Sequence, residues 1–126
     1  MNLITHQTGP LGREVKRLYV EEVSNISKEF YLSCLVDRAS SKIAFISSDQ
    51  GGVDIEEVAS KSPNKILTTQ VELKEKISNE ECEKIIQIFK LENNSKNEAI
   101  SLIKSIYKMF IETDANLVEI NPLILT

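Results

Sequence analysis

The sequence has few of the residues that mark common kinds of site. It contains no tryptophan, one histidine, two cysteines and four glycines in 126 residues. Cys34 and Cys82 are far apart and both occupy apolar positions, so we expect buried reduced thiols and neither a disulfide framework nor a zinc site. No apolar run approaches the roughly 20 residues of a membrane span. Reduced thiols predict an intracellular protein. Residues 1–8 lack the patterns of secretion and organelle-targeting signals.

Charge and motifs exclude further classes. The net charge is −4, and lysine and arginine are scattered along the chain, which argues against a nucleic-acid-binding surface. No P-loop, dinucleotide-binding fingerprint or nucleophile elbow is present. The single histidine, His6, stands alone in a polar stretch, and we expect no catalytic role for it.

Alternating apolar residues predict most of the strands. Phe30, Leu32, Cys34 and Val36 alternate with more polar positions in residues 29–37, which is typical of a strand with one buried face. Similar patterns predict strands at residues 16–24, 43–48, 65–73 and from about 117 onward. The glycines and proline of residues 9–12 predict a turn.

Capping sequences predict where the helices begin. Asp54, Ser78 and Ser95 are each followed three residues later by glutamate, which is the signature of a capping box. Apolar residues then recur at helical spacing, most clearly over residues 99–110. Together with the strands, these helices predict one α+β domain over residues 1–126, in which helices pack on a mainly antiparallel sheet.

The last strand carries the most informative pair of polar residues. Glu119 and Asn121 lie two apart in an apolar run, so they should share one face while Val118 and Ile120 enter the core. Carboxylate and amide oxygens suit Mg²⁺ or a phosphate-transfer site. The alternative is that the pair is simply the solvated face of an antiparallel strand. Pro122 is expected to mark a strand end or a sheet edge.

Two other carboxylates lie near predicted strand ends. Glu21 lies where the first predicted strand ends, and Glu29 opens the next. The backbone after Glu21 could contact the edge of a base, and Glu29, aligned with Tyr31, could accept hydrogen bonds from ribose hydroxyls. The alternative is that both are surface carboxylates of a hairpin. Gly51-Gly52 predicts a turn and is a weak signal for a binding loop on its own.

Five segments in order resemble one family. They are residues 19–23 (YVEEV), 28–32 (KEFYL), 36–38 (VDR), 51–56 (GGVDIE) and 119–123 (EINPL). Together they resemble the β subunit of succinyl-CoA synthetase (ADP-forming succinate–CoA ligase), an ATP-grasp enzyme, with the similarity running over residues 2–126. An intact β subunit is about three times as long, so the resemblance implies a partial ATP-grasp domain.

The resemblance implies a role for five residues. Glu21 matches the acidic hinge residue against which adenine lies, and Ser24 matches a following nucleotide-contacting position. Glu29 matches the carboxylate on the sugar and phosphate side of the nucleotide, which is ATP/ADP or GTP/GDP. Asn121 matches a Mg²⁺ ligand. Glu119 matches a glutamate near a phosphohistidine loop that belongs to the α subunit.

The resemblance also implies a reaction and a partner. The family interconverts succinyl-CoA, nucleoside diphosphate and phosphate with succinate, CoA and nucleoside triphosphate in the tricarboxylic acid cycle, as a heterodimer or heterotetramer with the α subunit. The upstream lysine and glycine-rich segment, the second Mg²⁺ ligand and the CoA-ligase-type domain do not occur in these residues. We therefore expect the isolated chain to be inactive and to bind ATP weakly or not at all.

Two alternatives stay open at this point. One is an ATP-grasp fragment of another acyl-CoA ligase, such as malate–CoA ligase, because acid selectivity depends on other parts of such enzymes. The other is a non-catalytic α+β interaction module. The family resemblance implies a cytoplasmic protein in a bacterium and a mitochondrial matrix protein in a eukaryote, with neither nucleic acid nor membrane as a partner.

Overall fold

The computed structural model describes residues 1–5 and 8–126, and it begins with a small hairpin. Strand β1 (Asn2–Leu3) pairs antiparallel with β2 (Arg13–Glu14). The turn predicted between them is present, and Gly9 and Gly12 adopt φ of +70° and +66°, which glycine tolerates best. His6 lies outside the described residues.

We call residues 28–126 the body. A four-stranded antiparallel sheet forms its centre. Its strands are β3 (Lys28–Asp37), β4 (Lys42–Ser48), β5 (Ile66–Val71) and β6 (Leu117–Leu125), in the order β5-β4-β3-β6. All neighbouring strands run antiparallel. The predicted α+β class and antiparallel sheet are confirmed.

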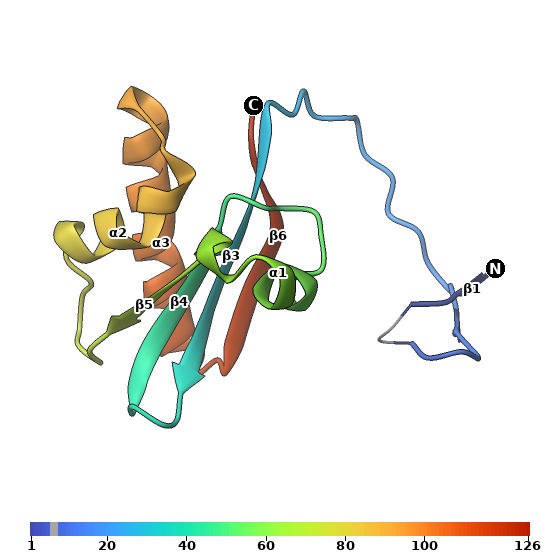
Figure 1. The fold of residues 1–126 in the computed structure, drawn as a ribbon, viewed down its shortest axis with the longest axis horizontal. Coiled ribbons are helices and arrows are strands. Elements are labelled where there is room, and N and C mark those ends of the chain that lie inside the picture. The colour runs from blue at the N-terminus through green and yellow to red at the C-terminus, as the bar shows by residue number, and fades with distance from the viewer. Residues whose placement is uncertain (6–7) are drawn as a thin grey trace.

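The helices are α1 (Ile55–Lys61), α2 (Asn79–Ile86) and α3 (Asn93–Glu112), with short 3₁₀ turns at Pro63–Lys65 and Gln87–Phe89. Helices α2 and α3 cover one side of the sheet, whereas α1 lies away from them (Figure 1). The core lies between the sheet and these two helices, since buried residues of β3, β4 and β5 form one cluster with those of α2 and α3. Cys34 and Cys82 are free and fully buried within it, as expected.

Two of the three predicted helix starts are confirmed. The Asp54 side chain accepts hydrogen bonds from the backbone N–H groups at the start of α1, and Ser78 forms a reciprocal capping box with Glu81 at α2. The start predicted at Ser95 is wrong, because α3 begins at Asn93 without a side-chain cap. Glu98, the expected partner of Ser95, instead accepts a hydrogen bond from Asn94 (2.6 Å).

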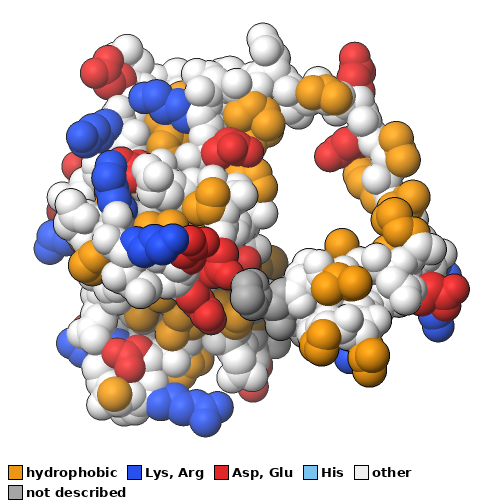
Figure 2. Space-filling view, turned by 45° about the vertical axis from the view of Figure 1, so that its right-hand side comes forward, with side chains coloured by type: hydrophobic (Ala, Val, Ile, Leu, Met, Phe, Trp, Pro, Cys, Tyr) orange, Lys and Arg blue, Asp and Glu red, His pale blue; other side chains and the backbone are white. Residues whose placement is uncertain are grey.

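The strand predicted at residues 16–24 is also wrong. Residues 15–27, which we call the arm, lead from the hairpin to β3 without helix or strand. Their apolar side chains Leu18, Tyr19, Val20 and Val23 are between 76% and 91% exposed. Figure 2 shows such side chains spread along the arm and not covered by the body. Alternation indicates a strand only where a neighbouring strand pairs with it, and within the described residues the arm has no such neighbour.

Neither the short helices nor α3 has the length and apolar content needed to cross a bilayer, judged over the described residues.

Candidate functional site

Strand β6 presents its polar pair as its alternation predicts. Glu119 and Asn121 are exposed, whereas Val118 and Ile120 pack against the core. The pairing with β3 shifts register between Phe30 and Leu32, so that Asn121 and Pro122 together face Tyr31. Pro122 therefore lies on an edge strand, as expected, but the strand continues past it to Leu125.

Glu119 has a buried partner. The Tyr31 hydroxyl donates a hydrogen bond to Glu119 Oε2 at 2.9 Å, and Tyr31 is only 4% exposed. Burial raises the pKa of Tyr31, and its hydrogen bond with Glu119 and the charge of that carboxylate raise the pKa further. Tyr31 is therefore protonated at neutral pH and able to hold the carboxylate in one orientation. Sequence reasoning placed Tyr31 beside Glu29 and missed this contact, which depends on the pairing of β3 with β6.

The Asn121 side chain bridges to a loop about 70 positions earlier in the chain. Its Oδ1 accepts a hydrogen bond from the Gly52 N–H (2.8 Å), and its Nδ2 donates one to the Val53 carbonyl (3.0 Å). Both hydrogen-bonding groups of the amide are thus engaged with backbone. Apart from the Gly51-Gly52 turn, no pattern in the sequence predicts this bridge.

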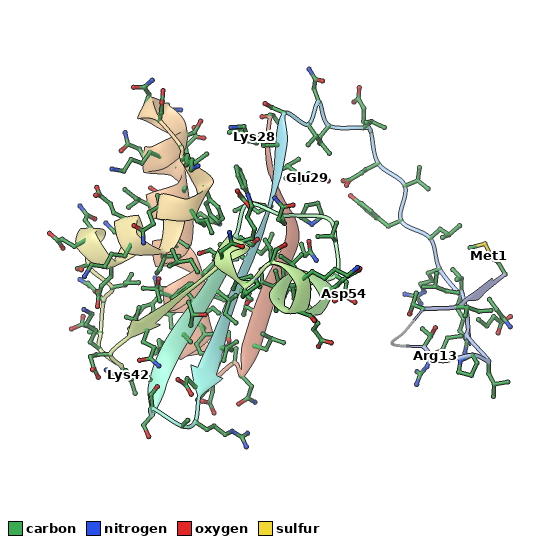
Figure 3. The ribbon with its side chains drawn as sticks, in the orientation of Figure 1. Met1, Arg13, Lys28, Glu29, Lys42 and Asp54 are labelled. Carbon is green, nitrogen blue, oxygen red and sulfur yellow. The ribbon has the colours of Figure 1, made fainter. Side chains whose placement is uncertain are left out.

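Glu29 contacts the same loop through its backbone carbonyl and its side chain. The Gly51 N–H donates to the Glu29 carbonyl (3.2 Å), and a Cβ at Gly52 would lie 3.1 Å and 3.2 Å from the two Glu29 carboxylate oxygens. Figure 3 shows Glu29 near the start of β3, with Asp54 at the start of α1. Glu29, the Gly51–Gly52 turn and Asn121 therefore form one neighbourhood, which we call the loop site.

The arm carries the other two expected nucleotide-contacting residues. Glu21 and Ser24 are both exposed, and no hydrogen bond in the described part of the chain ties either side chain to the body. Figure 1 shows the arm leading away from the sheet to the hairpin. The structure thus brings Glu29 and Asn121 together, and places Glu21 and Ser24 on a separate segment.

The donors at the loop site suit a hard cation. Asn121 Oδ1 has two lone pairs and gives one to Gly52, and Glu119 lies on the same face of β6. Mg²⁺ prefers such oxygens, keeps several waters and needs only one or two protein ligands. Among the described residues no group of three or more His, Cys, Asp or Glu side chains could hold a metal ion. The residues fit part of a Mg²⁺ site that phosphate oxygens and a further ligand would complete.

Comparisons with known proteins agree on one family. The model of the ATP-grasp domain matches residues 1–125. The chain is 72% identical over 98% of its length to the succinate–CoA ligase (ADP-forming) subunit beta of Pelagibacter ubique strain HTCC1062. Proteins of the same name from Parvibaculum lavamentivorans and Cupriavidus necator are 49% and 48% identical over 98% and 100% of the chain. The chain spans about a third, 32%, of each relative's length.

Proposed function

The chain belongs to the ATP-grasp family, and we propose that it forms the nucleotide- and metal-binding part of the β subunit of an ADP-forming succinate–CoA ligase. The observation that carries this proposal is the 72% identity to such a subunit over 98% of the chain. The loop site supports it, because a carboxylate, a hydrogen-bonded glycine loop and an amide on an edge strand meet there. Such groups position a nucleotide and its metal without doing covalent chemistry.

The proposed reaction passes a phosphoryl group through a histidine of the α subunit. It interconverts succinyl-CoA, nucleoside diphosphate and phosphate with succinate, CoA and nucleoside triphosphate. Phosphoryl transfer depends mainly on positioning and electrostatics. Glu119, fixed by the Tyr31 hydroxyl, accepts a hydrogen bond from the imidazole and holds it in the reactive tautomer.

The nucleotide is held from two segments. Glu29 accepts hydrogen bonds from the sugar hydroxyls, and Glu21 and Ser24 contact the base side through the arm, whose exposed backbone can donate and accept. ATP/ADP and GTP/GDP both suit a site that contacts the base through backbone. Asn121 would supply one oxygen ligand to Mg²⁺, and the bound ion would neutralise charge on the phosphate oxygens.

The remaining two thirds of the protein supply the other parts. They include the lysine and glycine-rich phosphate-binding segment, the second Mg²⁺ ligand and the domain that binds CoA and succinate together with the α subunit. The 126-residue chain on its own is therefore inactive. The complete heteromer, a dimer or tetramer, works in the tricarboxylic acid cycle, in the cytoplasm of a bacterium or the mitochondrial matrix of a eukaryote.

The test is formation of the phosphohistidine. The intact β subunit is co-expressed with its α subunit, incubated with γ-labelled ATP and Mg²⁺, and assayed for acid-labile label on the α subunit. Glu119→Gln keeps the size of the side chain but removes its charge, and should slow labelling by about 10²-fold or more. Glu75→Gln, at an exposed position away from β6, is the matched control and should label at the unchanged rate.

Two outcomes would count against the proposal in different ways. Absence of label on the wild-type α subunit would overturn the proposed function. Labelling of the Glu119→Gln enzyme at the wild-type rate would leave the function standing and overturn the role of Glu119.

A further inference from the structure

Two strands that lie far apart in the sequence, β3 and β6, converge on the loop Gly51-Gly52-Val53. Asn121 of β6 binds it through two side-chain hydrogen bonds, of 2.8 Å to the Gly52 N–H and 3.0 Å to the Val53 carbonyl. Glu29 of β3 binds it through its carbonyl, which accepts from the Gly51 N–H at 3.2 Å. The loop is therefore hydrogen-bonded both to the proposed sugar-binding residue and to the proposed metal ligand.

The two glycines are required by this arrangement. A Cβ at Gly51 would lie 2.4 Å from the backbone nitrogen of Phe30, so no other residue fits without moving the loop. Gly52 has φ of +68°, and a Cβ there would press on the Glu29 carboxylate at 3.1 Å. Glycine at position 52 thus lets the Glu29 side chain rest directly against the loop backbone.

We propose that Asn121 latches the Gly51-Gly52-Val53 loop and, through it, positions the Glu29 carboxylate for the nucleotide even when no metal is bound. This inference rests on the proposed function and adds to it a second, metal-independent role for Asn121. Asn121, Gly51 and Gly52 are positioning residues in this role. The loop couples the nucleotide and metal contacts, because moving it displaces both Glu29 and Asn121.

An asparagine is well suited to such a latch. Its amide presents one acceptor and two donors, so a single side chain can satisfy both the Gly52 N–H and the Val53 carbonyl. An ionised aspartate still accepts from Gly52, but it has no proton to donate to Val53 and would place two oxygens against each other. If Asn121 served only as a metal ligand, aspartate would be an equal or better choice, since it adds charge.

The decisive experiment measures nucleotide binding without metal. The intact β subunit with its α subunit is titrated with ADP in the presence of EDTA, for the wild type and for Asn121→Asp. We expect the dissociation constant for ADP to rise by about tenfold or more, because the Val53 carbonyl loses its donor and a carboxylate oxygen is placed against it. Asn116→Asp makes the same change of charge at an exposed position just before β6, and it should bind ADP like the wild type.

A second pair of variants tests the loop itself. Gly52→Ala should weaken metal-free ADP binding in the same direction, because its Cβ displaces Glu29. Gly9→Ala is the matched control, since Gly9 has nearly the same φ of +70° but nothing within 4 Å of its Cβ position. Hydrogen exchange of the Gly52 amide reports the latch directly and should quicken in Asn121→Ala, which removes the oxygen that accepts its hydrogen bond. Should Gly52→Ala fail to fold, the Asn121 variants and this exchange rate decide the question.

The outcomes separate this inference from the proposed function. A wild-type heteromer that binds no nucleotide overturns both. The latch alone is overturned if the wild type binds ADP, Asn121→Asp binds metal-free ADP equally well, and Asn121→Ala exchanges the Gly52 amide at the wild-type rate.

Discussion

The body and the arm contain similar apolar residues but use them in opposite ways. In the body, Phe30, Leu32 and Phe45 alternate along paired strands and are almost fully buried. The arm is also rich in apolar residues, but Leu18, Val20 and Val23 are largely exposed to solvent. The difference is the partner, because the body strands have neighbouring strands and two covering helices, and the arm has neither in the described residues.

The same division runs through the proposed site. Glu29, Glu119 and Asn121 belong to the body, where hydrogen bonds fix their surroundings at 2.8–3.2 Å. Glu21 and Ser24 belong to the arm and are exposed. The comparison indicates that hydrogen bonds hold the proposed site residues of the body in place, whereas no hydrogen bond in the described residues holds the side chains of Glu21 and Ser24.

The largest expected difference between body and arm is the loss of unfolding free energy when an apolar side chain is shortened. Phe45 is fully buried in β4, so Phe45→Ala should lower the free energy of unfolding of the chain by about 3–5 kcal/mol. Val20→Ala, in the arm, should change it by less than about 0.5 kcal/mol, because the side chain is already in water. Urea denaturation followed by circular dichroism measures both. Comparable losses for the two variants would mean that the arm is buried in solution and would remove the distinction.

The next effect is a loss of stability at alkaline pH that originates in the body. Burial raises the pKa of the Cys34 thiol from 9.0 to about 12. The stabilisation from the neutral buried thiol is complete below pH 9 and is lost as pH rises toward 12, because the unfolded chain releases the proton first. The maximum loss, from three pKa units, is about 4 kcal/mol.

The variant Cys34→Ala isolates this contribution. It is less stable than the wild type at neutral pH because of the cavity, but its unfolding free energy should fall less steeply between pH 9 and 12. Urea midpoints collected across this range for both proteins give the two slopes. Parallel slopes would show that the Cys34 thiol is not shielded from water as the structure has it.

Local sequence patterns predicted the elements of the body well, because the strands and helices that these patterns indicate also pack against one another in the structure. The alternation in residues 29–37 matches β3, and the capping pattern at Ser78 matches the start of α2. The same kind of pattern at Ser95 was wrong, since Asn94 competes for Glu98 and α3 begins earlier. A capping sequence identifies a helix that starts nearby, but competition between neighbouring polar residues decides the exact position.

The candidate site shows where sequence reasoning must stop. Alternation alone predicted that Glu119 and Asn121 share a face, because the argument is local to one strand. The contacts of Glu119 with Tyr31 and of Asn121 with Gly52 join residues 88 and 69 positions apart, and they depend on the register of β3 against β6 and on the course of the loop. The strand predicted at residues 16–24 is wrong for the same reason, because a strand forms only when a second segment pairs with it.

The smallest expected effect gives the sharpest test of the comparison. Removing residues 1–25 deletes the hairpin and most of the arm but keeps the hydrogen bond from the Ser27 N–H to the Leu125 carbonyl (2.7 Å). A two-stranded hairpin is marginal on its own, and the arm buries little, so the free energy of unfolding should change by less than about 0.5 kcal/mol. Urea denaturation of the full and shortened chains, monitored by the helices α2 and α3, measures the change. A loss above about 1 kcal/mol would mean that the arm packs on the body and that its exposed apolar side chains find a partner there.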